Sequence, residues 1–567
     1  MTDILLIQPP IRDFYMTAKR TIPYGLACIA SALIQAGFTV EILDALATRR
    51  SRILETPAEM DYLRGLYGGA DVSPFALFHR FRHYGRSFSF IEKAVRESGA
   101  FLVGISSLFT AYSGEAMRTA EVAKKALPHS WVAVGGHHAT ELPEAVMQCR
   151  AVDFVLRGEG ETSMPVLAQR LKAGADISSV PGIVYRTSND GIHIGQPAIT
   201  NTPDDCPLPA SHLIEHRYYS RKSRGSTVVV ASRGCPLHCS YCATGASSYI
   251  RYRRRSVARV LHEIECAVGE DAVGFIDFED ENISMDRLWF LELLQGIGKL
   301  TRGRGIELRA MNGIFPPTLD EEVIRSMKDA GFKVLNLSLG TTSRTQLKAF
   351  GRPDATSSFD ECMVHAAVNG LEAVGYIIVG APGQDPLDSV ADLLYLASRN
   401  VLAGVSVFYP APGSRDFARC REAGLLPSEY SLMRSTALPI SDRTTRPDSI
   451  TLLRLGRILN FIKSLRDVES TSVNVGKYGA TSKSLHHAES AEDDLERDSW
   501  HREARRREGL SLLRTFLLDG TIPGMTPQGE RFRHKASGAL CQAFRAGLLR
   551  IPAIAAMAHN LLGFGGE

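Results

Sequence analysis

Arg233-Gly-Cys-Pro-Leu-His-Cys-Ser-Tyr-Cys-Ala-Thr-Gly245 is the stretch that decides the fold of this chain, because it gathers three cysteines in one short segment. A β-branched apolar run at residues 226–231 precedes the segment and predicts a buried strand. A helical pattern follows at about residues 256–268. The three thiols are therefore expected in a loop that leaves a strand, which is where parallel α/β folds bind their ligands.

The three cysteines, Cys235, Cys239 and Cys242, have the spacing Cys-x3-Cys-x2-Cys. Thiolates are the usual ligands of iron–sulfur clusters, and this short spacing lets one loop hold three corners of a cubic cluster. A [4Fe–4S] cluster would then keep one iron open to an outside ligand. A zinc ion is the alternative, and it would need a fourth protein ligand such as His238 to complete its tetrahedron.

The cysteine loop resembles that of the radical S-adenosylmethionine (SAM) superfamily, in which an aromatic residue, here Tyr241, precedes the last cysteine. The resemblance implies a [4Fe–4S] cluster on Cys235, Cys239 and Cys242, SAM as a second cofactor, and Tyr241 at the SAM site. In that family the open iron is chelated by SAM, and electron transfer cleaves SAM to methionine and a 5′-deoxyadenosyl radical. An electron donor such as flavodoxin or ferredoxin is an implied partner.

The composition is that of a soluble globular protein, with 567 residues, 44% of them hydrophobic and 22% charged. The length suits roughly three or four domains. The net charge of +3 gives no indication of nucleic-acid binding. Ten cysteines with only one triplet at ligand spacing indicate reduced thiols and a cytoplasmic location. No apolar run is long enough for a transmembrane segment, and residues 1–7 are expected to form a strand, not a signal peptide.

Strands and helices alternate over residues 1–180, which predicts an open parallel sheet. Small and polar residues follow the expected strands, at the edge where such sheets bind ligands. The polar and aromatic segment 10–25 follows the first strand, and its Arg12, Asp13, Tyr15 and Lys19 are either substrate contacts or a solvated loop. The expected strands are 4–7, 39–43, 101–107, 131–136 and 154–156.

Three pieces of this region resemble the cobalamin-binding domain that precedes many radical SAM cores: Val103-Gly-Ile-Ser-Ser107, Val134-Gly-Gly-His-His-Ala-Thr140 and Arg157-Gly-Glu-Gly-Glu161. The resemblance implies a flavodoxin-like, Rossmann-type domain with cobalamin as a cofactor, and glycines let the backbone approach a large flat ring. The alternative is a scaffold that has lost the cofactor. The Asp-x-His-x-x-Gly motif of methionine synthase is missing, so no lower axial cobalt ligand is assigned. The implied cobalamin contacts are Ser106, Gly135, Gly136, His138, Gly158, Glu159 and Gly160.

A second βα series begins at the cysteine loop and predicts a partial (β/α)6 barrel, which is the fold of the radical SAM core. Barrel chemistry gathers at the carboxyl ends of the strands. The basic run at residues 251–255 is expected to be structural or to face a cofactor. The expected strands are 226–231, 274–278, 306–310, 334–339, 375–379 and 404–409.

By resemblance, polar and apolar residues at these strand ends would contact SAM. The acidic run Glu279-Asp-Glu-Asn282 has helix capping as its alternative, and Asn312 has a turn. Relatives usually carry Gly-x-Glu-Ser after the fourth strand, and that glutamate is missing here, which leaves Ser338 as a substitute. The implied SAM contacts are Tyr241, Glu279, Asp280, Asn312, Ser338, Gly380 and Pro382.

The βα pattern stops near residue 446, and the rest of the chain is expected to be mainly helical. The helices are expected at 450–465, 509–518 and 537–562, and a polar stretch at 467–505 has the composition of a mobile segment. The apolar stretch 549–564 is too short to span a bilayer. The expected domains are 1–180 (cobalamin-binding-like), 181–225 (linker), 226–445 (radical SAM core) and 446–567 (helical C-terminal region, expected to cover the barrel mouth).

Together the two resemblances imply an enzyme, a cobalamin-dependent radical SAM C-methyltransferase. Such an enzyme removes hydrogen from an unactivated carbon, which then receives the methyl group of methylcobalamin. One alternative is another radical reaction, such as cyclisation, rearrangement or methylthiolation. A second is a non-catalytic cobalamin or redox sensor. The sequence leaves the substrate open among small molecules, lipids and peptides.

Overall fold

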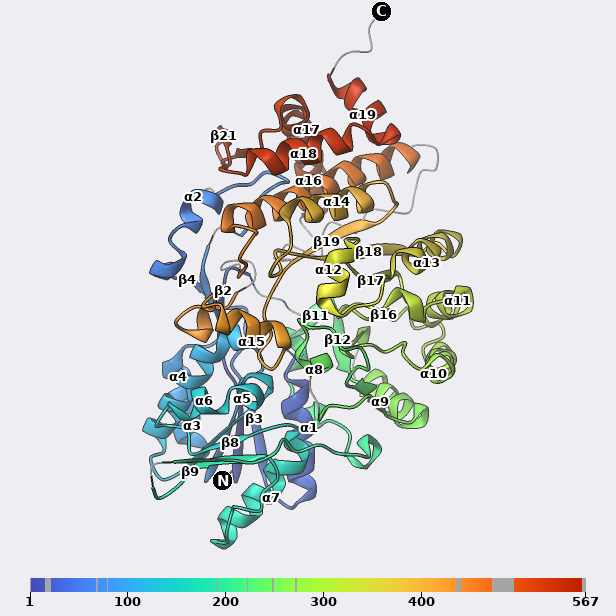
Figure 1. Cartoon of the computed structure of the whole chain (residues 1–567). Coiled ribbons are helices and arrows are strands. Elements are labelled where there is room, and N and C mark those ends of the chain that lie inside the picture. Colours follow the sequence, from blue (N-terminus) through green and yellow to red (C-terminus); the bar gives the residue numbers. More distant parts are fainter. Residues whose placement is uncertain are drawn as a thin grey trace, which may run out of the picture.

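The computed structural model describes residues 2–15, 22–67, 70–78, 80–189, 191–221, 223–246, 249–270, 273–434, 440–471 and 494–562. Figure 1 shows the N-terminal sheet at the bottom, the green and yellow elements of the barrel in the middle, and the orange and red C-terminal helices at the top. The functional site is therefore built from segments that are far apart in the sequence.

The N-terminal sheet has seven strands in the order β10-β9-β8-β7-β6-β1-β3. The five strands from β8 to β3 are parallel, and they confirm the expected open α/β sheet. The other two form an antiparallel edge that lies beyond residue 180, inside the expected linker. The strands are β1 (Ile4–Gln8), β3 (Val40–Asp44), β6 (Leu102–Ser106), β7 (Trp131–Gly135), β8 (Phe154–Leu156), β9 (Ile183–Arg186) and β10 (Ile192–Ile194).

Helices cover both faces of this sheet, because its central strands are apolar on both sides. In β1, Leu5 and Ile7 face one core and Ile4 and Leu6 face the other. Helices α3 (Phe88–Ser98) and α4 (Ser113–Ala126) contribute apolar side chains to the first core, and α1 (Tyr24–Gln35) and α7 (Gly160–Ala173) to the second. The loops that follow the parallel strands lie at the carboxyl edge of the sheet.

An additional small sheet interrupts the βα alternation, in the region where the sequence pattern is irregular. Its three strands, in the order β2-β5-β4, pair antiparallel. A short helix, α2, lies between β4 and β5 in the sequence. Two more short helices, α5 and α6, follow β7. These elements are β2 (Ile11–Asp13), β4 (Ser51–Ile53), β5 (Arg82–Tyr84), α2 (Leu63–Tyr67), α5 (His137–Glu141) and α6 (Pro143–Met147).

The barrel confirms the expected six βα units. Four strands in the order β11-β12-β15-β16 and three in the order β17-β18-β19 are joined by parallel bridges, Leu308 to Phe332 and Ile314 to Leu337. All the pairs from β12 to β19 are parallel, so the partial barrel is open at β19. The strands are β11 (Ser220–Arg221), β12 (Arg224–Val229), β15 (Val273–Phe278), β16 (Glu307–Arg309), β17 (Val334–Gly340), β18 (Glu372–Val379) and β19 (Leu402–Val407).

The helices of the barrel lie outside its strands and bury one apolar face each, as βα crossovers do. Trp289 and Phe290 of α10, Val323 of α11 and Phe359 of α13 belong to one continuous core with the strands. The helices are α9 (Val257–Glu270), α10 (Arg287–Leu300), α11 (Glu321–Ala330), α12 (Arg344–Phe350), α13 (Thr356–Val368), α14 (Pro386–Ala397) and α15 (Arg415–Glu422).

The C-terminal helix α16 (Arg446–Thr471) covers the open edge of the barrel at β19. Asn460 accepts a hydrogen bond from the Ala403 amide at 2.8 Å and donates one to the Ala403 carbonyl at 2.9 Å, so it replaces a missing strand partner. Leu455 and Leu459 are completely buried in the barrel core. The tail therefore closes a sheet edge, which is a role that its apolar spacing did not reveal.

The rest of the tail is helical, as expected, apart from a hairpin that the sequence analysis missed. The elements are α17 (Asp494–Asp519), β20 (Pro523–Met525), β21 (Arg531–Arg533), α18 (Gly538–Leu548) and α19 (Pro552–Leu562). The polar stretch from 467 lies partly outside the described residues. No described helix is alone long and apolar enough to cross a bilayer, and α18 and α19 reach that length only as a pair bent by 103°.

Candidate cluster and cofactor site

The cysteine loop leaves the barrel after β12 through a two-stranded ribbon. Its strands, β13 (Ser232–Arg233) and β14 (Arg253–Arg254), pair antiparallel and flank the loop on both sides. Gly234 opens the loop with φ +84°, and a Cβ there would lie 2.4 Å from the carbonyl oxygen of Arg251. Only glycine fits such a left-handed, crowded position. The ribbon therefore fixes where the first thiol begins.

The three thiols are free, and they lie at the edge of the protein interior. Cys239 is buried, while Cys235 and Cys242 are partly exposed. Burial, with a smaller contribution from the neighbouring thiols of Cys242 and Cys239, raises the pKa of the Cys235 thiol to about 11. Bound iron would displace these protons, because metals bind the thiolate form.

Residues from the far side of the barrel hold the loop in place. Ser240 donates from its hydroxyl to Asp416 at 2.7 Å, and its amide donates to the carbonyl of Phe350 at 2.8 Å. The buried guanidinium of Arg352 lies 3.8 Å from the Cys239 sulfur and donates to the Tyr241 hydroxyl at 3.2 Å. A buried cation beside a thiolate favours the charged form. Sequence reasoning missed Arg352 and Asp416, because nothing in their local spacing marks them.

The loop offers three thiols and one histidine, His238, as possible metal ligands. The Nδ1 atom of His238 is 2.9 Å from the carbonyl oxygen of Gly245, so a backbone contact already orients the ring. Within the part of the chain that the structure describes, no three histidine, cysteine or acidic side chains, those of the loop included, are already arranged around one metal position. Three free thiols beside a buried arginine match the chemistry of a cluster that keeps one open iron.

The acidic run after β15 accepts hydrogen bonds from backbone amides at the start of the cysteine loop. Asp280 is 4% exposed, and its carboxylate accepts hydrogen bonds from the amides of Ala231 and Ser232. Burial raises the pKa of Asp280 to about 7. Glu281 accepts a hydrogen bond from the Gly234 amide at 3.1 Å. Asp280 is thus engaged by the backbone, whereas Glu279 is only partly buried.

The remaining expected SAM residues stand at the ends of their strands. Asn312 is exposed and donates to the Asp280 carbonyl at 3.4 Å. Ser338 donates to the carbonyl of Ile314 at 3.2 Å and accepts a hydrogen bond from Arg352. Gly380, with φ +75°, leads to the buried Pro382. These residues lie at one edge of the barrel together with the loop, because the carboxyl ends of parallel strands meet there.

The expected contacts for the second cofactor include residues at the carboxyl ends of β6 and β7. Gly136 has φ +111°, and the amide of His138 donates to the Ser107 carbonyl at 3.2 Å. Burial lowers the pKa of His138 to about 4, so its imidazole is neutral and sits 3.2 Å from the Thr110 hydroxyl. The Ser107 hydroxyl is buried and has no partner among the described residues. A cradle with an unsatisfied polar atom fits a ligand such as cobalamin.

Gly136→Ala is expected to destabilise the protein by at least about 2 kcal/mol, because the new Cβ would lie 2.7 Å from the Ser107 carbonyl oxygen in a left-handed backbone. Gly135→Ala is the matched control, since its Cβ would meet only the Leu156 carbonyl at 3.6 Å. It should cost less than about 1 kcal/mol. Thermal unfolding of the two variants and a cobalamin titration check the difference. Equal stability of the two variants would contradict the prediction.

Only part of the expected cobalamin contacts lie together at the carboxyl ends of β6 and β7. Ser106, Gly135, Gly136 and His138 end or follow β6 and β7. Residues 158–160 instead lie at the interface with the barrel, where the carboxylate of Glu159 contacts arginines of the ribbon. Their cobalamin contact stays a prediction, and the structure gives Glu159 protein partners.

A cluster of buried acidic side chains lies at the start of α4. Glu115 is 5% exposed, and Arg12 Nε lies 3.3 Å from its carboxylate. The Tyr112 hydroxyl donates to the buried carboxylate of Asp13 at 2.6 Å. Arg434 lies against this group and donates to the carbonyls of Ala111 and Arg12. Arg12 and Asp13, which are either substrate contacts or part of a solvated loop by sequence, are therefore held by the protein itself, and Lys19 lies outside the described residues.

The stability of the protein should depend on pH through Glu115. Burial raises the pKa of Glu115 to about 7, against the opposing effect of Arg434 and Arg12. A folded-state pKa above the usual value of 4.5 means that the folded state binds the proton more tightly, so stability falls as pH rises from about 4.5 to about 7. The difference corresponds to roughly 3 kcal/mol.

Glu115→Gln should remove this fall, which urea titrations between pH 4.5 and 8 would measure as the difference between variant and wild type. Glu121→Gln is the matched control, because Glu121 lies on the same helix and pairs with Arg118 at the surface. It should keep the pH dependence of the wild type. A Glu115→Gln variant with the same pH dependence as the wild type would show that the carboxyl does not titrate in this range.

Comparison with known proteins agrees with the two halves of the site. The B12 binding domain family matches residues 78–168, and the Radical SAM superfamily matches residues 229–394. An uncharacterised methyltransferase of Pyrococcus horikoshii is 25% identical over 416 residues, 73% of this chain and 82% of the relative. The cytidylyl-2-hydroxyethylphosphonate methyltransferase of Streptomyces wedmorensis is 26% identical over 473 residues, 76% of this chain and 84% of the relative.

A solved structure shares the whole arrangement of domains. The radical SAM methyltransferase TsrM from Kitasatospora setae, with cobalamin and a [4Fe–4S] cluster bound, superposes with a TM-score of 0.59 at 16% identity. The match covers 90% of this chain and 99% of that one, and it shows a common fold.

Fold, cysteine loop and family matches define an iron–sulfur enzyme of the radical SAM type. The chain carries a region of the B12 binding domain family followed by a region of the Radical SAM superfamily, and relatives that align with most of its length are methyltransferases. Its cofactors are a [4Fe–4S] cluster, SAM and cobalamin.

Proposed function

We propose that this enzyme methylates an unactivated carbon of a small-molecule, lipid or peptide substrate. The observation that carries the proposal is the joining, in one chain, of a glycine turn after β7 in an open α/β sheet to a three-cysteine loop that follows the first strand of a partial barrel. The methyltransferases that align with most of the chain support methyl transfer as the reaction.

The cofactors, when bound, supply a carbon-centred radical that removes hydrogen and a methyl group that a substrate radical can accept. The residues of this chain bind and orient them. Cys235, Cys239 and Cys242 would hold the cluster, and the Arg352 guanidinium beside Cys239 would stabilise its negative charge. The Gly135-Gly136 turn and the Ser107 hydroxyl would receive cobalamin.

The SAM contacts expected at the strand ends belong to the same proposal. Glu279 and Asn312 would take its polar groups, and Ser338, Gly380 and Pro382 would line its other side. Asp280 acts through the loop, because its carboxylate is bound to the amides of Ala231 and Ser232. Tyr241, which packs edge-on against Phe350 with 4.9 Å between ring centroids, would close the site.

An electron donor such as flavodoxin or ferredoxin completes the proposal, because reductive cleavage of SAM consumes one electron. The experiment uses the anaerobic holoenzyme with a chemical reductant and SAM whose methyl group carries deuterium. The substrate source is an extract of a strain from which the gene is deleted. Mass spectrometry should find a product that has gained one labelled methyl group.

Other outcomes of this experiment would overturn the proposal. Cleavage of SAM with a changed product that carries no label would assign the enzyme to another radical reaction. A holoenzyme with a full complement of cluster and cobalamin that leaves SAM intact under reductant would favour a sensor.

A further inference from the structure

The acidic turn (residues 158–161, Gly-Glu-Gly-Glu) of the cobalamin-binding domain contacts the ribbon that carries the cysteine loop. Glu159 Oε1 lies 2.7 Å from Arg253 Nη2 and 3.2 Å from Arg233 Nη1. Glu161 forms a second ion pair with Arg233. The four side chains are between 10% and 27% exposed, so solvent screens these pairs only in part.

The ribbon has a built-in repulsion that these carboxylates offset. Arg233 and Arg253 are directly opposite each other across β13 and β14. Like charges at opposed positions of a strand pair are destabilising, and a two-stranded ribbon alone has little other stability. One carboxylate oxygen of Glu159 bridges both guanidinium groups, so docking of the two domains offsets the repulsion between the two arginines.

The backbone of the turn is shaped for this contact. Gly158 has φ +85°, and a Cβ there would lie 2.2 Å from the carbonyl oxygen of Ala198. The second oxygen of Glu159 accepts the Thr200 amide at 2.7 Å, and Arg253 also donates to the Thr200 carbonyl. The Thr200 amide thus holds one oxygen of the Glu159 carboxylate, and the other oxygen contacts the ribbon.

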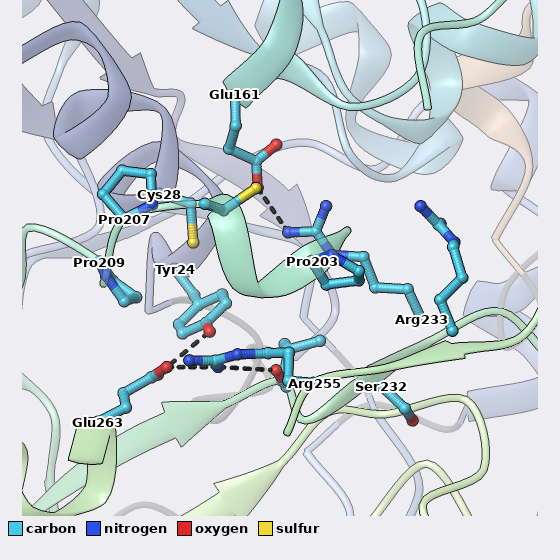
Figure 2. A pocket seen from close by; sticks show the side chains of 13 residues that line it. Tyr24, Cys28, Glu161, Pro203, Pro207, Pro209, Ser232, Arg233, Arg255 and Glu263 are labelled. Carbon is cyan, nitrogen blue, oxygen red and sulfur yellow. Dashed lines mark hydrogen bonds and ion pairs between the residues drawn. The ribbon is translucent and has the colours of Figure 1, made fainter. Parts of the chain in front are cut away.

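A second contact between the domains lies next to the first, across a small pocket. Tyr24 of α1 donates to Glu263 of α9 at 3.1 Å, and Glu263 pairs with Arg255, which follows the ribbon directly. Figure 2 shows Glu161 and Arg233 on one side of this pocket and Tyr24, Glu263 and Arg255 on the other. Both ends of the cysteine loop are therefore tied to the first domain.

We propose that the acidic turn is the clamp that positions the cysteine loop against the cobalamin-binding domain, with Glu159 as a positioning residue. This inference rests on the proposed function only in taking the loop as the cluster-holding element. The clamp sets the separation between the two cofactor sites, because the turn begins α7 on one side and Arg233 lies two residues before Cys235 on the other. The carboxylates therefore act through the ribbon and not as contacts to cobalamin.

Glu159→Gln tests the clamp, because it keeps the shape of the side chain and removes its charge. In the holoenzyme, amide hydrogen exchange of β13 and β14 should become about tenfold faster, since the two arginines then repel each other. The cobalamin dissociation constant, from an absorbance titration, should stay within about twofold of the wild type. Glu92→Gln is the matched control, because Glu92 pairs with Arg96 at the surface of the same domain.

A second substitution makes the test specific. Glu159→Gln combined with Arg253→Gln removes both the bridging charge and one of the two opposed positive charges, so ribbon exchange should return toward the wild-type rate. A Glu159→Gln holoenzyme with unchanged ribbon exchange would overturn the clamp. So would a cobalamin affinity that falls tenfold or more with the ribbon intact, which would assign Glu159 to the cofactor.

If Glu159→Gln does not accumulate as folded protein, Glu161→Gln replaces it and should give a smaller acceleration in the same two strands, because the bridging oxygen remains. Wild-type exchange in that variant would overturn the clamp. Neither readout needs turnover, so an enzyme that proves not to be a methyltransferase can still show the ribbon effect.

Discussion

Cys239→Ala is expected to abolish the brown iron–sulfur chromophore and to reduce SAM cleavage to the uncatalysed background. Cys239 is the buried member of the three thiols, and it lies 3.8 Å from the Arg352 guanidinium. Two thiolates cannot replace three at a cluster that already keeps one iron open. Iron and sulfide analysis after anaerobic reconstitution, together with the yield of 5′-deoxyadenosine, measures both effects.

The control for this variant is Cys266→Ala. Cys266 lies on α9, is partly buried and has no second cysteine at ligand spacing. That variant should keep the iron content and the SAM cleavage of the wild type. Wild-type iron content in Cys239→Ala, or a reconstituted wild type that binds one zinc ion and stays colourless, would remove the basis for the cluster and for the radical reaction.

Arg454→Met is expected to destabilise the junction between the C-terminal region and the N-terminal domain by about 3–5 kcal/mol. The Arg454 side chain is fully buried and donates to the carbonyls of Leu66 and Phe75. It lies 3.8 Å from the buried carboxylate of Asp71, which is also 2.7 Å from His534 Nε2. Removing the cation leaves a buried carboxylate and two backbone carbonyls with fewer partners.

The charge of Arg454 persists at neutral pH. Burial lowers the pKa of its guanidinium to about 10, and Asp71 opposes that change. Urea unfolding, monitored by amide hydrogen exchange in α16 and β21, measures the loss of stability at this junction. A local probe is needed because a chain of several domains does not unfold in two states. Arg531→Met is the matched control, because Arg531 of β21 pairs with Glu508 of α17 at the surface, and the substitution should cost about 1 kcal/mol or less. Equal losses in the two variants would contradict the prediction.

The fold was largely predictable because its signals are local. Continuous apolar runs such as 102–106 and 131–135 form strands that are largely buried on both faces of the sheet. These runs alternate with helical segments, and each βα repeat carries its own turn residues. The antiparallel edge strands β9 and β10 were missed because β10 is largely exposed and both strands are short. The hairpin β20–β21 was missed for the same reason, since a three-residue strand shows too little periodicity.

The candidate site was predictable only where one segment carries the chemistry. The cysteine spacing and the Gly135-Gly136 turn lie within a few residues, so the sequence alone indicates a cluster loop and a close backbone approach. The residues that contact the loop lie far from it in the sequence, so the sequence alone does not indicate them. Arg352 is 113 residues from Cys239, and Arg253 is 94 residues from Glu159.

The sequence by itself therefore determined the α/β layout, the ligand spacing and the glycine turns, because these depend on residues close together in the chain. Only the tertiary structure decided which charges meet. Glu159 pairs with arginines of the ribbon, Asp280 binds the backbone before the loop, and Asn460 completes the edge of β19. Opposite charges attract at any separation along the chain, so the pairs that form are selected by the packing of whole domains.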